Sequence, residues 1–201
     1  MSALADRLRA LPTAALVDAS SDAAWLGSSV GPLWGTASMA GRAYTVQTRR
    51  GDNRPLHLAT ADALPGDVLV VAAEAAVDVA IFGDVLARIA SERGLAGLVT
   101  DGAVRDRDGI REVGFPVFCA GVALRQPVKA FPGVFGGAVR IGAAQVHAGD
   151  WIVADGDGVV VVRRAVAPDV ARAAEQVLLR EADIVRRAGD GESSADQLGL
   201  R

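Results

Sequence analysis

Residues 84–93 carry apolar positions at the spacing of an α-helix, and the segments on either side follow different patterns. The predicted apolar face of this helix consists of Val85, Leu86, Ile89 and Ala90. Gly83 before it and Gly94 after it suit the two ends of a helix, because glycine adopts backbone conformations that other residues avoid. Residues 97–100 form an apolar run too short for a helix, which predicts a buried strand, and Asp101-Gly102 ends it.

The rest of the chain shows the same mixture of helical and strand patterns. Helices are predicted as two short segments within residues 2–26, with Thr13 as an N-cap, and over residues 55–62 and 168–188. Strands are predicted at 42–48 and 67–73, with short β-segments between residues 116 and 162 after a Gly/Ser-rich loop at 27–39. We therefore expect one α/β domain over residues 1–190 and a flexible C-terminal tail at residues 191–201.

Composition narrows the classes of function. The chain has 201 residues, 51% of them hydrophobic, which is enough for one sizeable core. The net charge of −3 gives no indication of nucleic-acid binding, which favours basic patches. The charged N-terminus is unlike a signal peptide, and no apolar run is long enough to span a membrane. A cytoplasmic enzyme without a membrane partner is the expectation.

Candidate chemistry gathers at both ends of the segment from Gly83 to Asp106. A loop, a helix, a strand and a turn fold back on themselves, so Gly83 and Asp84 are expected near Arg105 and Asp106. The helix start offers free N–H groups to an anion, and Arg105 offers a planar fork of donors that matches a carboxylate. Asp106 is an oxygen ligand of the kind preferred by Mg²⁺ or Mn²⁺, and Asp84 can hold a water on that metal. This set of groups suits cleavage of a carbon–carbon bond beside a 2-oxo acid, with a metal and Arg105 stabilising an enolate.

The same residue types have an ordinary structural explanation. Asp-Gly and Arg-Asp pairs are common in exposed turns, and an aspartate after a glycine is a usual helix cap. Spacing alone does not choose between a site and a turn.

Other residues that can carry chemistry favour structural roles. Cys119 lies among apolar neighbours, which predicts a buried thiol. His57 and His147 are isolated and lack the spacing of a metal site. The segment Asp155–Gly158 fits a hairpin turn better than a calcium loop, because it lacks the length and the terminal glutamate of an EF-hand.

The chain resembles a known family at these same residues. The resemblance rests on Asp84 followed after twenty residues by Arg105-Asp106, on the phrase at 99–106, and on Gly114–Phe118. Further similar segments lie at 11–19, 41–46, 64–71, 136–139 and 148–159, so the resemblance covers about residues 11–165 in the same order. On these segments the chain is similar to the RraA-like proteins. This family includes the class II 4-hydroxy-4-methyl-2-oxoglutarate (HMG)/4-carboxy-4-hydroxy-2-oxoadipate (CHA) aldolases.

The resemblance implies a fold, an activity and a set of roles. The fold is a single α/β domain of the swivelling β/β/α type. The activity is that of a lyase dependent on Mg²⁺ or Mn²⁺, which cleaves HMG or CHA or decarboxylates oxaloacetate by way of a pyruvate enolate. Gly83, Asp84, Val85 and Leu86 bind the pyruvyl part of the substrate, Arg105 holds the substrate, and Asp106 binds the metal directly. Asp84 contacts metal-bound water, so Asp84 and Arg105 are the expected catalytic residues.

The resemblance also bears on assembly and on an alternative function. The relatives form homotrimers or homohexamers with sites near subunit interfaces, and the aldolases use an acidic residue from a neighbouring subunit that cannot be aligned with this chain. Some RraA proteins instead bind ribonuclease E as non-catalytic regulators. Both the small-molecule lyase and the regulator remain open at this stage, and metal-dependent activity would separate them.

Overall fold

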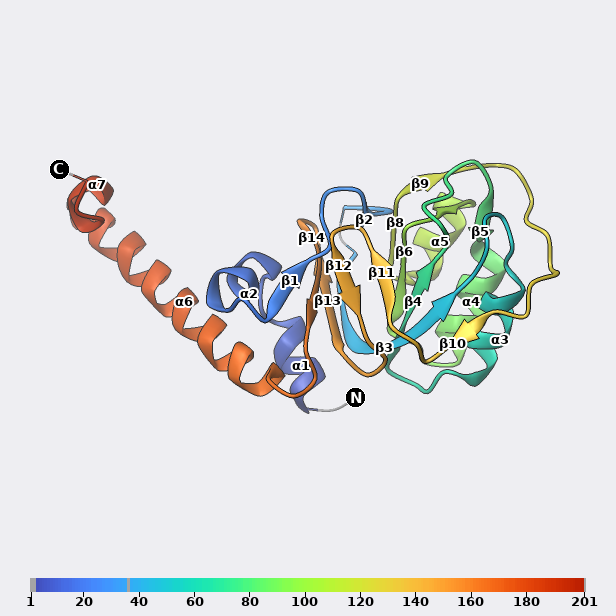
Figure 1. The fold of residues 1–201 in the computed structure, drawn as a ribbon. Coiled ribbons are helices and arrows are strands. Elements are labelled where there is room, and N and C mark those ends of the chain that lie inside the picture. Colours follow the sequence, from blue (N-terminus) through green and yellow to red (C-terminus); the bar gives the residue numbers. More distant parts are fainter. Residues whose placement is uncertain (1–2, 36, 201) are drawn as a thin grey trace.

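A nine-stranded mixed sheet forms the centre of the molecule (Figure 1). The computed structural model describes residues 3–35 and 37–200. The sheet contains β1 (Ala23–Trp25), β2 (Gly31–Pro32), β3 (Met39–Gln47), β4 (Asp67–Ala72), β6 (Gly97–Thr100), β8 (Val117–Cys119), β10 (Val134–Phe135), β13 (Trp151–Asp155) and β14 (Gly158–Val162). Its order is β1-β14-β13-β3-β4-β6-β8-β2, and β10 pairs with the end of β3. The strands β3, β4, β6 and β8 run parallel, which requires crossover connections, and each of the three connections between them contains a helix.

Two smaller sheets accompany the central one. The strands β5 (Ala80–Phe82), β7 (Ala103–Val104) and β9 (Gly121–Val122) form a parallel three-stranded sheet. The strands β11 (Val139–Ile141) and β12 (Ala144–Val146) form an antiparallel hairpin.

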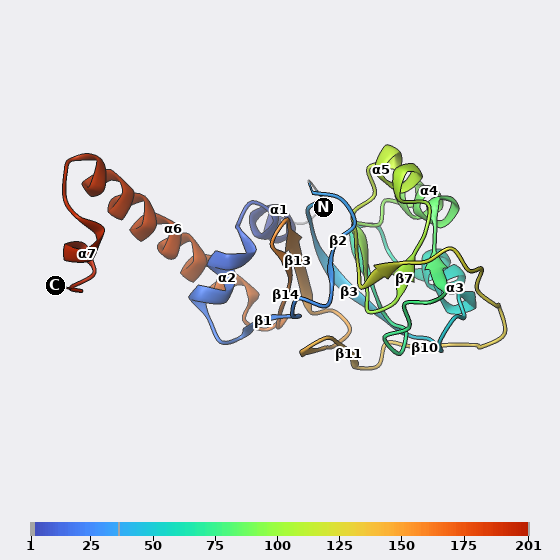
Figure 2. The same ribbon diagram turned by 90° about the horizontal axis from the view of Figure 1, so that it is seen from above.

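The helices fall into two groups at opposite ends of the molecule (Figures 1 and 2). One group consists of α3 (Arg54–Asp62), α4 (Asp84–Glu92) and α5 (Arg107–Val113). The other consists of α1 (Ala3–Arg9), α2 (Thr13–Ala19), α6 (Ala167–Gly189) and the terminal α7 (Ser194–Gln197). Among the described residues, no helix is both long and apolar enough to cross a membrane.

The alternation of side chains along β4 explains the layers. Leu69 and Val71 point into a core shared with α3, α4 and α5, whereas Val68 and Val70 point into a core shared with the β11–β12 hairpin. Successive side chains of a strand point to opposite faces, so one strand of apolar residues supports both layers. The result is a β/β/α arrangement in one domain, as predicted.

The C-terminal helix packs on the domain only over its first half. Its buried residues end at Val177, and beyond that point α6 and α7 project from the body (Figure 1). We call residues 178–200 the C-terminal arm. Surface helices usually bury an apolar face, but this arm leaves Leu179, Val185, Leu198 and Leu200 more than half exposed.

The structure corrects several expectations about elements. Thr13 does not cap α2: Pro12 occupies that position, and the Thr13 hydroxyl donates instead to Asp155 Oδ1 at 2.7 Å. Residues 23–25 form β1 rather than helix, because they pair with β14 at the edge of the sheet. The buried face of α4 consists of Leu86, Ala87 and Ala90, since neighbouring helices cover that side. Val85 and Ile89, which the sequence assigned to the apolar face, are 64% and 42% exposed.

Candidate active site at the ends of β5 and β7

Two short parallel strands bring the ends of the Gly83–Asp106 segment together. The strand β5 pairs with β7, with Ala80 opposite Ala103 and Phe82 opposite Val104. Directly beyond this pair, the Arg105 N–H donates to the Phe82 carbonyl at 2.9 Å. Gly83 and Arg105 therefore lie side by side at the carboxyl ends of adjacent strands, where α/β proteins commonly bind ligands.

The start of α4 presents unused donors at this edge. Gly83 is the N-cap residue, the first helical bond runs from the Ala87 N–H to the Gly83 carbonyl at 3.0 Å, and no side chain caps the helix. The N–H groups of residues 84–86 have no carbonyl to bind within the helix. Together with the positive end of the helix dipole, they favour an anionic ligand.

Asp106 reaches the start of α4 across this junction. Its backbone has φ 57° and ψ 43°, a left-handed conformation that aspartate tolerates better than most residues. A Cβ atom added to Gly83 would lie 2.6 Å from Asp106 Oδ2 and 3.3 Å from Arg105 Cγ. Only glycine at position 83 allows the carboxylate to lie this close to the backbone.

Arg105, Asp106 and Asp84 are held but remain accessible. Arg105 Nε lies 3.3 Å from Asp106 Oδ2, and Asp84 Oδ2 lies 4.0 Å from Arg88 Nε. The side chains of Asp84, Arg105 and Asp106 are 34–40% exposed, so a ligand can contact each of them. On α5, a Cβ at Gly109 would lie 3.0 Å from the Asp84 Cβ, which shows how tightly the two helices enclose Asp84.

These groups line one cavity of about 250 Å³. Its lining residues are Asn53, His57, Ala80, Phe82, Gly83, Asp84, Val85, Leu86, Arg105, Asp106, Gln126, Pro127 and Lys129. The cavity includes all six of the residues that the sequence singled out for a site. The structure thus brings these residues together on one cavity instead of in unrelated turns.

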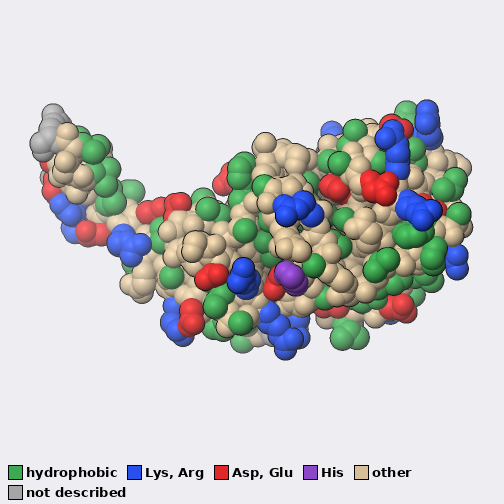
Figure 3. All heavy atoms as spheres, in the orientation of Figure 1, with side chains coloured by type: hydrophobic (Ala, Val, Ile, Leu, Met, Phe, Trp, Pro, Cys, Tyr) green, Lys and Arg blue, Asp and Glu red, His purple; other side chains and the backbone are tan. Residues whose placement is uncertain are grey.

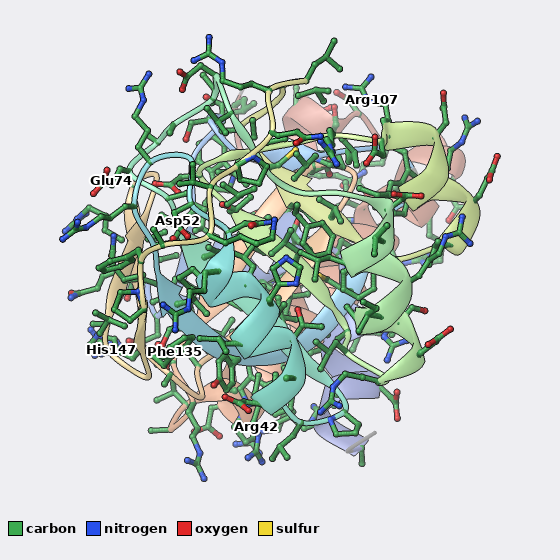
Figure 4. All side chains as sticks on the ribbon, turned by 90° about the vertical axis from the view of Figure 1, so that its right-hand side faces the viewer. Arg42, Asp52, Glu74, Arg107, Phe135 and His147 are labelled. Carbon is green, nitrogen blue, oxygen red and sulfur yellow. The ribbon has the colours of Figure 1, made fainter. Side chains whose placement is uncertain are left out.

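A second wall of the cavity comes from the start of α3 and from the loop at residues 123–133. Asp52 fastens that loop: its Oδ2 accepts the N–H groups of Ala130 at 2.8 Å and Phe131 at 2.7 Å. Burial opposes ionisation of Asp52, but these donors and the Arg54 N–H outweigh it and lower the pKa of Asp52. Figure 4 shows Asp52 beside the start of α3, inside the packed side chains.

Asn53 takes an unusual role at the same place. It occupies the N-cap position of α3, where asparagine normally accepts a backbone N–H, yet its side chain caps nothing. Its Oδ1 is buried and has no hydrogen-bond partner, and the residue is only 7% exposed. A buried acceptor without a donor costs about 1–3 kcal/mol, which a ligand donor in the cavity would recover.

Positive charge dominates the second wall. Lys129 lies on the 123–133 loop, and no carboxylate among the described residues forms an ion pair with it within 4.0 Å. Partial desolvation and the charge of Lys129 lower the pKa of His57. His57 is therefore neutral at pH 7, and Lys129 carries the positive charge.

The donor set fits a hard divalent cation. Within the described part of the chain, no cluster of three or more His, Cys, Asp or Glu residues forms a metal cage. Magnesium needs only one or two carboxylates, because it keeps several of its waters. Asp106 and Asp84 provide two accessible carboxylates on one cavity, which meets that requirement.

The remaining candidates from the sequence lie outside the site. His147 lies at the opposite edge of Figure 4 from α4 and α5, near the β11–β12 hairpin. Cys119 is buried, and burial raises the pKa of its thiol, so it is a poor nucleophile. Asp155 pairs with Gly158 in the predicted hairpin, and its carboxylate accepts the N–H and hydroxyl of Thr13.

Sequence reasoning missed the second wall. It assigned His57 a structural role and gave Asn53 and Lys129 no role, because nothing in their spacing connects them to Arg105. One signal was present: Asn53-Arg54-Pro55 is a typical helix start, and His57 lies one turn further on the same helix. Lys129 carried no such signal.

Comparisons with known proteins identify the family. A family model described as RraA-like, Aldolase/RraA, matches residues 13–161. A protein from Halalkalibacterium halodurans named "Putative 4-hydroxy-4-methyl-2-oxoglutarate aldolase" is 34% identical over 170 residues, which are 85% of this chain and 81% of that protein.

Solved structures show the same fold. The RNA-processing inhibitor RraA from Thermus thermophilis matches with a TM-score of 0.70 at 28% identity, over 75% of this chain and 92% of that chain. Streptomyces coelicolor RraAS2, described as an unusual member of the RNase ES inhibitor RraA protein family, matches with a TM-score of 0.80 at 29% identity, over 90% of this chain and 95% of that chain. With the family model covering most of the chain, and with close agreement in fold, this protein belongs to the RraA-like family.

Proposed function

We propose that this protein is a divalent-metal-dependent lyase that cleaves a carbon–carbon bond in 2-oxo acids and produces a pyruvate enolate. The observation that carries the proposal is the meeting of Arg105, Asp106 and the uncapped start of α4 on one cavity. The name of the Halalkalibacterium halodurans relative supports HMG as a substrate. Oxaloacetate is the second candidate, because its decarboxylation produces the same enolate.

Each residue of the site has a distinct proposed task. Arg105 binds the carboxylate of the 2-oxo acid in bidentate fashion, and the N–H groups of residues 84–86 hold the oxygens of the pyruvyl part. Asp106 would hold Mg²⁺ or Mn²⁺ directly, and Asp84 would contact a water bound to the metal. When bound, the metal supplies positive charge that favours the electron-rich form of the 2-oxo group.

The reaction follows from how these groups are arranged. In HMG the bond between C3 and C4 breaks, its electron pair passes to the pyruvyl half, and the proton of the C4 hydroxyl passes to a water as that carbon becomes a ketone. Arg105 and the N–H groups of α4 face the oxygen on which negative charge grows. Asp84 orients the water that returns a proton to the pyruvyl carbon. In oxaloacetate the same electron pair is released by loss of carbon dioxide.

The decisive experiment measures pyruvate release from HMG, CHA and oxaloacetate, each with Mg²⁺ and with EDTA. We expect metal-dependent release from HMG or CHA that exceeds the rate with free metal. Release from oxaloacetate alone would reduce the function to a decarboxylase. No release from a folded protein would contradict the lyase.

A second function has a specific observation in its favour. Two structurally similar proteins are described as an inhibitor of RNA processing and as a member of the RNase ES inhibitor family. If the chain is a regulator of this kind, it binds ribonuclease E and inhibits its cleavage of RNA without added metal at the site. Titration of the protein against ribonuclease E, with Asp106→Ala as a control for the cavity, separates the two functions.

We also propose that the protein assembles as a homotrimer or homohexamer. The exposed apolar residues of the C-terminal arm support this, since single exposed side chains are common but a projecting helix normally packs on something. An acidic residue from a neighbouring subunit would then complete the site.

A further inference from the structure

Two neighbouring strands of the central sheet lead directly into the two strands that carry the site. The strand β4 continues through residues 73–79 into β5, which ends directly before Gly83. The strand β6 continues through Asp101-Gly102 into β7, which ends directly before Arg105. Because β4 pairs with β6 and β5 pairs with β7, the alignment of these two connections determines where Gly83 lies relative to Arg105.

The Asp101 carboxylate joins the two connections. Its Oδ1 accepts the N–H of Ala73 at 2.5 Å, and its Oδ2 accepts the N–H of Ala75 at 3.0 Å. Beside these bonds, the Ala103 N–H donates to the Ala76 carbonyl at 3.1 Å. Asp101 does not line the candidate cavity, so any effect of its side chain on the site passes through the backbone of β5 and β7.

The connection that Asp101 holds has a strained backbone. Among the described residues, those other than glycine with a positive φ are Glu74 at 56°, Ala75 at 51° and Asp106 at 57°. A left-handed conformation is unfavourable for alanine because its Cβ crowds the backbone, and it persists only where other contacts maintain it. The Asp101 bonds to Ala73 and Ala75 lie on both sides of Glu74 and maintain this conformation.

The opposite end of the same two strands has little tolerance for a shift. The Arg105 N–H donates to the Phe82 carbonyl at 2.9 Å, and a Cβ on Gly83 would lie 2.6 Å from Asp106 Oδ2. A movement of β5 along β7 would change both distances. Displacements of about 1 Å at a reacting centre can cost about 10²-fold in rate.

We propose that Asp101 is a positioning residue of the candidate site. It holds the strained connection before β5 and thereby sets the position of the α4 start relative to Arg105 and Asp106. The effect on turnover rests on the proposed lyase function, whereas the effect on backbone geometry does not.

Asp101→Asn tests this role, because it keeps the size of the side chain and removes one of its two acceptors. The amide oxygen still accepts one N–H, but the amide NH₂ then faces the other N–H, and two donors cannot bond. Outer partners of a metal site typically contribute about 10–100-fold, so kcat should fall and the Kd for Mg²⁺ should rise by about tenfold or more. Kinetics and calorimetry measure these changes.

A third measurement needs neither metal nor substrate. Hydrogen exchange at the Arg105 amide, followed by NMR, reports the bond between β7 and the end of β5. In Asp101→Asn this amide should exchange faster than in the wild type, when its rate is compared with that of the slowest amides of the same variant.

Asp150→Asn is the matched control. The Asp150 carboxylate also accepts two backbone N–H groups from separate segments, His147 at 3.0 Å and Arg164 at 3.1 Å, and it does not line the candidate cavity. This variant should lose thermal stability as Asp101→Asn does, while kcat, Mg²⁺ affinity and the relative exchange of the Arg105 amide stay at wild-type values.

Ala75→Gly separates positioning from a general loss of stability. Glycine adopts the left-handed conformation without strain, so the connection no longer depends on both bonds to Asp101. The double variant Asp101→Asn/Ala75→Gly should therefore recover most of the lost kcat and Mg²⁺ affinity, whereas Ala75→Gly alone should match the wild type.

The outcomes decide the proposal independently of the lyase. Wild-type kcat, Mg²⁺ affinity and Arg105 exchange in Asp101→Asn would overturn it, as would equal losses in Asp150→Asn or no recovery in the double variant. A wild type that cleaves no 2-oxo acid would contradict the lyase, yet faster Arg105 exchange in Asp101→Asn alone would still support the positioning role.

A second variant covers the case in which Asp101→Asn does not fold. Ala75→Val keeps the carboxylate and adds a β-branched side chain at an exposed left-handed position, which increases the strain. It should lower kcat and Mg²⁺ affinity and speed Arg105 exchange in the same direction. Wild-type values of all three in Ala75→Val would overturn the proposal.

Discussion

At the scale of single residues, the site depends on backbone geometry as much as on side-chain chemistry. Asp106 holds a left-handed conformation, which costs about 1–3 kcal/mol in a residue other than glycine. Two backbone hydrogen bonds on either side of it maintain this geometry. The Arg105 N–H donates to the Phe82 carbonyl at 2.9 Å, and the Ile110 N–H donates to the Asp106 carbonyl at 2.9 Å. Asp106 is a strained residue that lines a cavity and lies next to the uncapped N-terminus of α4. This combination favours a functional role for Asp106 over an ordinary turn.

Asp106→Ala should abolish metal-dependent turnover and leave the fold intact, because it removes an accessible carboxylate from a loop. Isothermal titration with Mg²⁺ or Mn²⁺ measures the lost metal affinity directly. The matched control is Asp108→Ala, which removes a carboxylate that is 82% exposed and lies outside the cavity. Unchanged metal affinity in folded Asp106→Ala would remove this residue from the site.

Arg105→Ala should lower kcat by about 10²–10³, the usual cost of losing a preorganised donor to developing charge. Arg105→Lys should recover only part of the rate, because an ammonium group cannot bind a carboxylate through two parallel donors. Steady-state kinetics with oxaloacetate or HMG measure the effect, with Arg111→Ala on α5, outside the cavity, as the control. Near-wild-type rates for Arg105→Ala would argue against enolate stabilisation by this side chain.

Gly83→Ala should displace Asp106, because the added methyl group would lie 2.6 Å from its Oδ2. Since displacements of about 1 Å can cost 10²-fold in rate, we expect at least a tenfold loss of activity with little loss of stability. Gly137→Ala is the control, because no atom lies within 4 Å of its added methyl group. Full activity in Gly83→Ala would mean that Asp106 need not lie against α4.

At the scale of elements, the site depends on how a long loop is tied to a helix start. The 123–133 loop contains no helix or strand between β9 and β10 (Figure 1), but Val128 forms an isolated β-bridge with Asp52, and the Asp52 side chain accepts two backbone N–H groups of the loop. Because Asp52 immediately precedes Asn53, one short segment anchors the loop and presents a side chain to the cavity. The two walls are thus built by different kinds of contact: parallel strand pairing for one, and a buried carboxylate for the other.

Asp52→Asn should destabilise the protein by about 2 kcal/mol at pH 7, since charged hydrogen bonds to a buried carboxylate are lost. The pKa of Asp52 is lowered in the folded state, so its stabilisation is complete above the ordinary carboxyl pKa near 4 and is lost as pH falls through the folded pKa. The gap in unfolding free energy between wild type and variant should therefore shrink below about pH 4. Urea denaturation at several pH values measures it, with Asp108→Asn as the control; a gap independent of pH would contradict the anchoring role.

At the scale of the whole molecule, the C-terminal arm stands out from the compact body (Figures 1 and 2). Its helix is supported by ion pairs along its own surface, such as Arg186 with Asp183 at 2.7 Å and with Asp190 at 3.1 Å. Exposed pairs of this kind contribute about 0.3–0.5 kcal/mol each, which is less than packing provides. Figure 3 shows both signs of charge mixed along the arm, with apolar side chains between them. A second copy of the chain is the partner that we propose for this surface.

Replacing both Leu179 and Val185 by glutamate should dissociate the proposed trimer or hexamer, because charge would replace two apolar side chains that are 62% and 71% exposed in one chain. Light scattering after gel filtration measures the mass, and circular dichroism checks that the subunit remains folded. The control is Arg172→Glu, an exposed change on the half of α6 that packs against the body. An unchanged mass for the double variant would exclude the arm as the contact.

Much of the architecture could be predicted from the sequence because it follows from local pattern. The helix after Gly83, the strand at 97–100, the hairpin at 155–158 and the long C-terminal helix all lie where periodicity and turn residues placed them. Arg105, Asp106 and the residues from Gly83 to Leu86 were also identified from the sequence, because one fold-back of the chain carries both ends of that wall.

Tertiary structure alone decided the features that join distant segments. Val85 and Ile89 have the spacing of a buried face, but which side of α4 is covered depends on α3 and α5, and so they are exposed. Thr13 is a residue type that commonly caps helices, but its hydroxyl donates a hydrogen bond to the nearby carboxylate of Asp155 instead. Asn53 and Lys129 share a cavity with Arg105 only because Asp52 ties a loop about eighty residues away to the start of α3. Local patterns record which element a residue prefers, whereas contacts between elements depend on the packing of the entire chain.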